Sequence, residues 1–311
     1  TMENTRAKTT RNSLILLLTA TIWGMAFVSQ SKGMDYMHPF TFNGVRSLIG
    51  AAGILVYILI SRKIAGDKAA KLDWKLNVKA GLLCGIFLTI ASTLQQFGIK
   101  YTSVGKAGFI TTLYIIFVPM FGIFLKKKVA PVVWAAAGMA AVGMYLLCMT
   151  ESLRLGAGDI MVFLCAIAFA IQIMTVDHYA ARIDGALVSC IQFTVCGVVC
   201  CIGALIWGQP TFGQIQEGLG ALLYAGVLSC GVGYTLQIVG QKGLNPTVAA
   251  LIMSLESVIA TISGWIAYKI GFLSTDQTLT PRQIAGCVIV FAAVILVQLP
   301  PEWFRFGKKN D

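Results

Sequence analysis

The chain has 311 residues, of which 57% are hydrophobic and only 12% are charged. A soluble domain carries about 25% charged residues, so this composition excludes an ordinary soluble protein and indicates one embedded in lipid. The 24 Lys and Arg residues outnumber the 13 Asp and Glu residues, but they lie between apolar segments rather than along one stripe. A nucleic acid partner is therefore not expected.

Ten apolar segments follow one another along the chain, each near the roughly 20 residues that a membrane-crossing helix needs. They cover residues 13–31, 39–61, 77–98, 103–125, 131–149, 158–178, 186–208, 219–240, 247–269 and 281–299. Little sequence remains between them, so no soluble domain is expected. The predicted fold class is an all-α integral membrane protein with ten transmembrane helices.

Lys and Arg residues concentrate in alternate loops. One set of loops and termini holds the basic clusters at 6–11, 62–79, 126–128 and 305–309, whereas the other set holds only scattered basic residues. The positive-inside rule then places both termini in the cytoplasm. We expect a multi-pass protein of the cell membrane.

The two halves of the chain resemble each other. Residues 93–100 (TLQQFGIK) and 235–242 (TLQIVGQK) share five of eight positions at an offset of 142, and the same register aligns 107–114 with 249–256. A register of 146 aligns the first two spans with the sixth and seventh more weakly. This predicts two five-helix repeats, 1–150 and 151–311. Because five is odd, the second repeat enters the membrane from the opposite side, as in secondary transporters.

Four motifs carry a resemblance to a known family: IWGMAF (22–27), HPFTFNGVR (38–46), GIKYTSVGKAGFIT (98–111) and TPRQIAG (280–286). With them the sequence resembles the drug/metabolite transporter (DMT) superfamily, in its ten-helix EamA branch, over nearly the whole chain. The resemblance implies two inverted repeats and the transport, more often the export, of small metabolites. Family members often carry a Glu just after the fourth and ninth helices. Lysines stand there in this chain, so no role is carried over to those places.

Glu256 is the leading candidate for a binding residue. It lies nine residues into the ninth span, about 14 Å deep and close to the bilayer midplane. Its partner in the repeat is Tyr114, at a similar depth in the fourth span, so the two side chains are expected to face each other across a central cavity. Glu256 has two functional roles open to it, binding a proton or pairing with a substrate amino group. A structural alternative is a protonated Glu bonded to a neighbouring helix.

Arg46 and Trp23 are further substrate-binding candidates inside the spans. Arg46 is able to attract an anionic substrate group, to snorkel to the outer headgroups or to pair structurally. Trp23 lies near the midplane, where it either lines a cavity or is buried against a partner helix. Pro119 removes a backbone hydrogen bond to Ile115. It predicts a kink just beyond Tyr114 and is a hinge candidate.

Uncharged polar residues inside the spans complete the expected substrate site. They are Gln95, Gln172, Gln237, Asn43 and Ser254. Each of them alone is equally suited to an interhelical hydrogen bond. Gln95 and Gln237 are equivalent in the repeat and lie towards opposite membrane faces, so they are also gate candidates.

The chain contains no Walker loop, nucleophile elbow, HExxH or GxGxxG motif, and its nine cysteines form no CxxC pair. We therefore expect no enzyme, no cofactor and no metal. The leading prediction is a secondary transporter of an amino acid or similar amphipathic metabolite, with possible proton coupling. An organic-cation carrier is the alternative within transport, and a membrane-embedded lipid enzyme or a channel the alternative outside it. Expected partners are the substrate, membrane lipid and, through small residues of the fifth helix, a second copy.

Overall fold

A computed structural model describes residues 2–66, 72–126, 129–148, 156–274 and 276–298, and within them every regular element is a helix. Parts of the basic clusters, at 67–71, 127–128 and 305–309, lie outside the described residues. The helices of the first half are α1 (Met2–Gly33), α2 (Pro39–Ala65), α3 (Trp74–Ile99), α4 (Val104–Thr112), α5 (Tyr114–Phe124) and α6 (Pro131–Cys148).

The helices of the second half are more often interrupted. Its elements are α7 (Ala157–Tyr179), α8 (Gly185–Gly203), the π-helix η2 (Ala204–Gly208), the short α9 (Phe212–Glu217), α10 (Leu219–Leu223), the π-helix η3 (Tyr224–Gly233), α11 (Tyr234–Gln241), α12 (Pro246–Met253), α13 (Glu256–Lys269) and α14 (Pro281–Gln298). The expected all-α membrane protein is confirmed. Within the described residues, eight segments are long and apolar enough to cross a membrane, and the apolar parts of α6 and α14 are shorter.

Local sequence explains where the helices begin. Proline occupies the first position of α2, α6, α12 and α14, where its missing N–H would have had no helical partner. Side-chain caps start several others: Asp73, Ser103 and Asp184 each accept a hydrogen bond from a backbone N–H three residues ahead. The helix starts are thus encoded locally, one span at a time.

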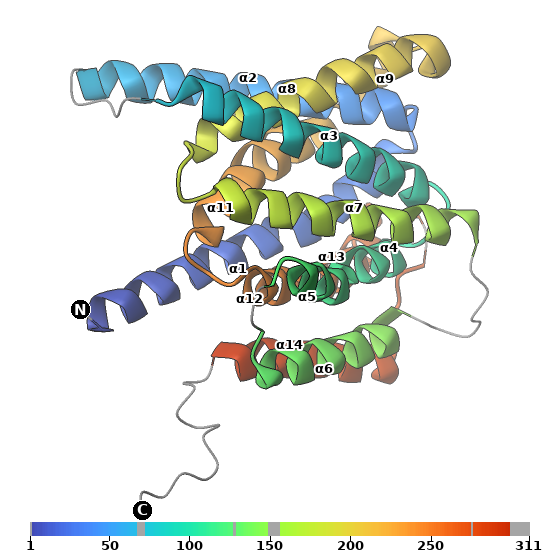
Figure 1. Cartoon of the computed structure of the whole chain (residues 1–311). Coiled ribbons are helices and arrows are strands. Elements are labelled where there is room, and N and C mark those ends of the chain that lie inside the picture. The colour runs from blue at the N-terminus through green and yellow to red at the C-terminus, as the bar shows by residue number, and fades with distance from the viewer. Residues whose placement is uncertain (1, 67–71, 127–128, 149–155, 275, 299–311) are drawn as a thin grey trace, which may run out of the picture.

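The helices lie side by side in a bundle (Figure 1). α2 packs on α8, α3 packs on α7 and α8, and α1 packs on α11, η3 and α13. α6 and α14 pack against each other at one side of the bundle. The small residues Ala136, Ala137 and Ala140 of α6 are buried, and Gly143 lies directly against α14. Because these residues are used within the chain, a second copy docking on α6 stays a prediction.

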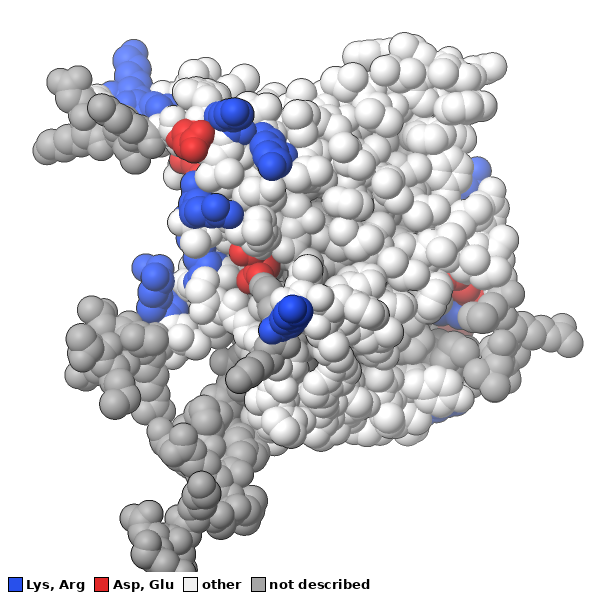
Figure 2. All heavy atoms as spheres, viewed as in Figure 1, with Lys and Arg blue, Asp and Glu red and all other residues white. Residues whose placement is uncertain are grey.

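The outside of the bundle has the character expected for contact with lipid. Figure 2 shows uncharged atoms over most of this face, with Lys and Arg gathered mainly at the edge where α1 begins and α14 ends. Large apolar side chains are exposed on the flanks, such as Leu59 and Phe124, whereas Gln96, Gln172 and Gln192 are fully buried. This arrangement suits lipid as the surrounding solvent.

Two glycines of α2 offer a matched test of the packing. At Gly50 a Cβ atom would lie 2.7 Å from the Cβ of Cys230 and 2.8 Å from the carbonyl oxygen of Gly226 in η3, whereas at Gly53 it would meet nothing within 4 Å. We expect Gly50→Ala to lower the free energy of unfolding by about 1–3 kcal/mol. Gly53→Ala should leave it unchanged or raise it, because alanine favours helix. Unfolding both variants in one detergent checks this, and equal effects would contradict the close α2–η3 contact.

Candidate functional site

Two helical segments are interrupted near the middle of their length. α4 and α5 are separated at Leu113, directly before Tyr114, and α12 and α13 are separated at Ser254 and Leu255, directly before Glu256. Tyr114 and Glu256 are therefore the first residues of the helices that follow the breaks. They are also 142 positions apart, the offset of the sequence repeat.

A hydroxyl group turns back onto the helix at each break. Thr112 Oγ1 donates to the carbonyl oxygen of Phe109 at 2.9 Å, and Ser254 Oγ donates to that of Leu251 at 2.7 Å. In both places the following leucine donates its N–H to a carbonyl only three residues back. Such local bonds compete with the regular helical ladder, and here they accompany both interruptions.

The kink expected just beyond Tyr114 stays a prediction, and the structure shows a separate interruption directly before Tyr114. After it, α5 continues through Pro119 to Phe124. The second break has the same hydrogen-bond pattern although 247–269 contains no proline. An interruption of this kind therefore forms without a proline. A hinge at Pro119 stays a prediction.

The breaks bring the two leading candidates into direct contact. The Tyr114 hydroxyl donates to Glu256 Oε1 at 2.9 Å, and the two residues are 2% and 4% exposed. Among the described residues no Lys or Arg lies within ion-pair distance of the Glu256 carboxyl group. The phenol is therefore the partner of an acidic side chain that is otherwise surrounded by protein interior.

A small cavity lies beside this pair. Its volume is about 30 Å³, enough for about one or two water molecules. Most of the residues predicted for the substrate site line it: Trp23, Arg46, Gln95, Tyr114, Gln172, Gln237 and Glu256. These residues come from seven helices of both halves, so the cavity is central to the bundle.

Asn43 and Ser254 do not line the cavity, in contrast to the prediction. Asn43 Nδ2 donates to the carbonyl oxygen of Ser92 at 2.9 Å and thereby ties α2 to α3. Ser254 caps the end of α12 through its own back-bond. Both side chains satisfy backbone groups instead of facing the cavity, because short polar side chains find such partners close by.

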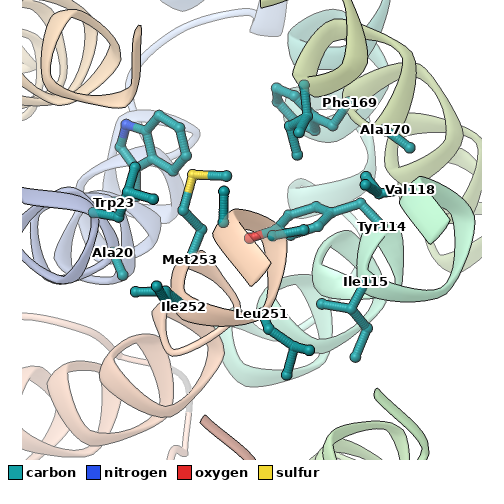
Figure 3. Packing of buried hydrophobic residues seen from close by; sticks show 14 of the residues in the cluster. Ala20, Trp23, Tyr114, Ile115, Val118, Phe169, Ala170, Leu251, Ile252 and Met253 are labelled. Atoms are coloured by element: carbon teal, nitrogen blue, oxygen red, sulfur yellow. The ribbon is translucent and has the colours of Figure 1, made fainter. Parts of the chain in front are cut away.

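One wall of the cavity is aromatic. The rings of Trp23 and Tyr234 lie 4.4 Å apart between centroids, and Phe193 meets Tyr234 edge-on at 5.0 Å. In Figure 3 the side chain of Met253 lies between Trp23 and Tyr114, so apolar contacts continue from the wall to the Tyr114–Glu256 pair. Such a wall suits an apolar or aromatic part of a ligand.

Tyr234 was missed in the sequence although a signal was present. It immediately precedes the repeated TLQ motif at 235–237, at a depth where tyrosine is unusual in a membrane helix. The π-helix η3 just before it also escaped prediction. η3 supplies Ser229 and Cys230 to the cavity lining, and its Ser229 carbonyl oxygen lies 3.4 Å from Trp23 Nε1.

The glutamines do not meet across the cavity but lie in separate clusters. Gln237 Nε2 donates to Gln172 Oε1 at 3.0 Å, and Gln172 Nε2 lies 3.5 Å from Gln192 Oε1, which joins α7, α8 and α11. Gln95 Nε2 donates instead to Thr111 Oγ1 at 3.2 Å. The gate role of Gln95 and Gln237 stays a prediction.

Several apolar helices that surround a buried polar cavity define a multi-pass membrane protein. The profile of the EamA-like transporter family matches residues 11–149 and, a second time, 156–299. The chain belongs to this family, which confirms the resemblance seen in its motifs.

Known relatives agree with this assignment. The chain is 28% identical over 290 residues to an uncharacterized transporter of Archaeoglobus fulgidus, covering 91% of this chain and 84% of the relative. It is 24% identical over 295 residues to the uncharacterized transporter YwfM of Bacillus subtilis, covering 93% and 94%. A solved crystal structure with 16% identity superposes over 96% of this chain and 99% of its own, with a TM-score of 0.73, which shows a shared fold.

Removing one hydroxyl group tests the central contact. Tyr114→Phe leaves a buried carboxyl group without its donor, so we expect it to lower the free energy of unfolding by about 1–3 kcal/mol. Tyr57→Phe makes the same change at a side chain that is 60% exposed on the lipid-facing flank and should have little effect. Thermal and chemical unfolding of both variants measures the difference. If the two variants match, the phenol does not stabilise the carboxyl group.

Proposed function

We propose that this chain is a secondary transporter of a small organic metabolite and that it works by alternating access. The observation that carries the proposal is the meeting of Tyr114 and Glu256 at a central cavity, each placed there by an equivalent helix break. A transporter built from inverted repeats binds its substrate at such broken helices near the midplane.

The contacts between helices support two inverted five-helix repeats, 1–150 and 151–311. In this division α7 is the equivalent of α1. α3 packs on α7, and its equivalent α11 packs on α1. In the same way α4 and α5 contact α7, whereas their equivalents α12 and α13 contact α1. α2 packs on its own equivalent α8, and α6 on α14. Each contact thus recurs with the halves exchanged, as a twofold relation requires. The two separate matches of the family profile support the same division.

The basic edge of the bundle supports the orientation in which both termini lie in the cytoplasm of a cell membrane. The size of the cavity supports a closed conformation. A volume of about 30 Å³ is far below the roughly 300–1,000 Å³ typical of small-molecule pockets. Substrate entry then requires the halves to move apart, which favours a carrier over an open channel or a lipid enzyme.

Glu256 is proposed as the proton-coupling residue. An ionised carboxylate is unfavourable inside a membrane protein unless it is paired, and Glu256 has a phenol but no cation beside it among the described residues. A bound proton removes that charge before the halves rearrange. The proposed substrate is an amino acid or similar amphipathic compound, moved outward. The aromatic wall beside Glu256 would also suit an organic cation, but Arg46 on the same cavity opposes one.

Flux through proteoliposomes tests the coupling. Preloaded radiolabelled amino acids are followed with and without a pH gradient for wild type, Glu256→Gln and the matched control Glu217→Gln, whose side chain is exposed on α9. We expect the gradient to accelerate flux in wild type and in the control at least several-fold, and to have no effect in Glu256→Gln. Equal gradient dependence in all three proteins would remove Glu256 as the coupling residue.

A further inference from the structure

We infer that the transported compound carries a carboxylate group and that Arg46 binds this group inside the central cavity. The inference deepens the transport function proposed above and names the chemical class of its substrate. It rests on the environment of Arg46, on the contrast with its equivalent in the second repeat and on the charge of the cavity.

Arg46 is a buried positive charge without a counter-charge. It is 5% exposed, and its Nε has no hydrogen-bond partner. The ion pairs Lys32–Asp35 and Lys106–Asp159 do not include Arg46, and no other carboxylate among the described residues pairs with it. Its guanidinium carbon Cζ lies over the face of the Phe42 ring, 5.5 Å from the ring centroid. A guanidinium group stays charged at any physiological pH, so it cannot relieve this by losing its proton.

Snorkelling does not explain Arg46. The residue lies seven positions after Pro39, about 10 Å along α2, and its side chain lines the central cavity. A snorkelling side chain would instead be exposed near the headgroups. Lys106, another cation near a helix end, forms an ion pair with Asp159, with 2.6 Å between Nζ and Oδ2. Arg46 has no carboxylate partner of this kind among the described residues.

The other repeat marks the site as asymmetric. The register of 146 pairs Arg46 with Gln192, which is uncharged and lies in the amide cluster with Gln172. The two equivalent positions thus differ in charge, with an uncharged amide in one half and a cation in the other. A site with this polarity binds a ligand in one orientation, with its anionic end at Arg46 and an apolar part against Trp23 and Tyr234.

The charge of the cavity favours a carboxylate over other anions. Arg46 and Glu256 both line it, so an ionised Glu256 leaves no net positive charge and a protonated one leaves a single charge. A ligand with one negative charge neutralises the single positive charge of the protonated state, whereas a phosphate carries nearly two negative charges. A carboxylate also offers two oxygens in the geometry that a guanidinium group binds in a bidentate manner. A lipid headgroup is not favoured, because the side chain faces the cavity rather than the surface.

Binding to the purified full-length protein tests this without requiring transport. The melting temperature is measured with phenylacetate and benzoate, each beside its neutral amide, with L-phenylalanine as a zwitterion, and with inorganic phosphate as a free anion. The proteins are wild type, Arg46→Gln, Arg46→Lys and Arg182→Gln. Arg46→Gln installs the residue of the other repeat, and Arg182→Gln removes an exposed arginine of equal charge. The melting temperature is also compared between vesicles with and without anionic lipid.

We expect carboxylates to raise the melting temperature of wild type and of Arg182→Gln more than the amides do. Arg46→Gln should lose this preference, with affinity for carboxylates lowered about thirtyfold or more, and Arg46→Lys should keep part of it. The inference is overturned if Arg46→Gln keeps the preference, if carboxylates and amides act alike on wild type, or if only phosphate or anionic lipid stabilises it. Should Arg46→Gln fail to fold, Arg46→Lys decides. A ratio of carboxylate to amide affinity in Arg46→Lys that equals the wild-type ratio would then overturn the inference. Loss of the pH-gradient effect on flux would leave this binding result intact, so the two failures can be told apart.

Discussion

Lipid offers no hydrogen-bond partner, so the polar side chains in the middle of this bundle depend on the protein, or on what it binds, for theirs. The hydrogen bond from Tyr114 to Glu256 is the clearest case. It satisfies an acidic group that would otherwise be among the most unfavourable in the membrane interior. The helix breaks, the cavity and the proposed coupling all follow from the need to place that one acidic group against that one donor.

The breaks link local sequence to this central contact. At each break a threonine or a serine bonds to the backbone of its own helix, and the next helix begins with the residue that faces the centre. Helix packing fixes where the two starts meet, with α4 against α13 and α5 against α12. The Lys106–Asp159 pair fastens the N-terminal ends of α4 and α7. The closed cavity is thus held both at its centre and at one end, and opening it requires these contacts to change.

Much of this arrangement was predictable from the sequence, for physical reasons. Membrane spans are long apolar segments, so their order and approximate limits could be read directly. The offset of 142 paired Tyr114 with Glu256, because equivalent positions in two similar folds lie at similar depth. Arg46 and Trp23 were found because charged and bulky polar groups are rare in lipid. Asn43 and Ser254 do not line the cavity, because sequence shows depth in the membrane but not which side of a helix faces inward.

Other features depended on three-dimensional context. The interruption directly before Tyr114 was not predicted, because no proline or glycine marks it in the sequence. The π-helix η3 has no composition of its own, yet its close contact with α2 at Gly50 and Gly226 shapes the cavity wall. Tyr234, the residue directly after η3, lines the cavity.

The inverted relation of the two halves is the claim on which the proposed mechanism depends, and labelling from the two sides of the membrane tests it directly. Asp35 and Ala181 occupy equivalent loops at the register of 146, and both are exposed. Asp35→Cys and Ala181→Cys are introduced separately and treated with a membrane-impermeant thiol reagent in sealed vesicles of known sidedness. The account predicts that the first reacts from outside and the second from the cytoplasmic side. Reaction of both from the same side would contradict it.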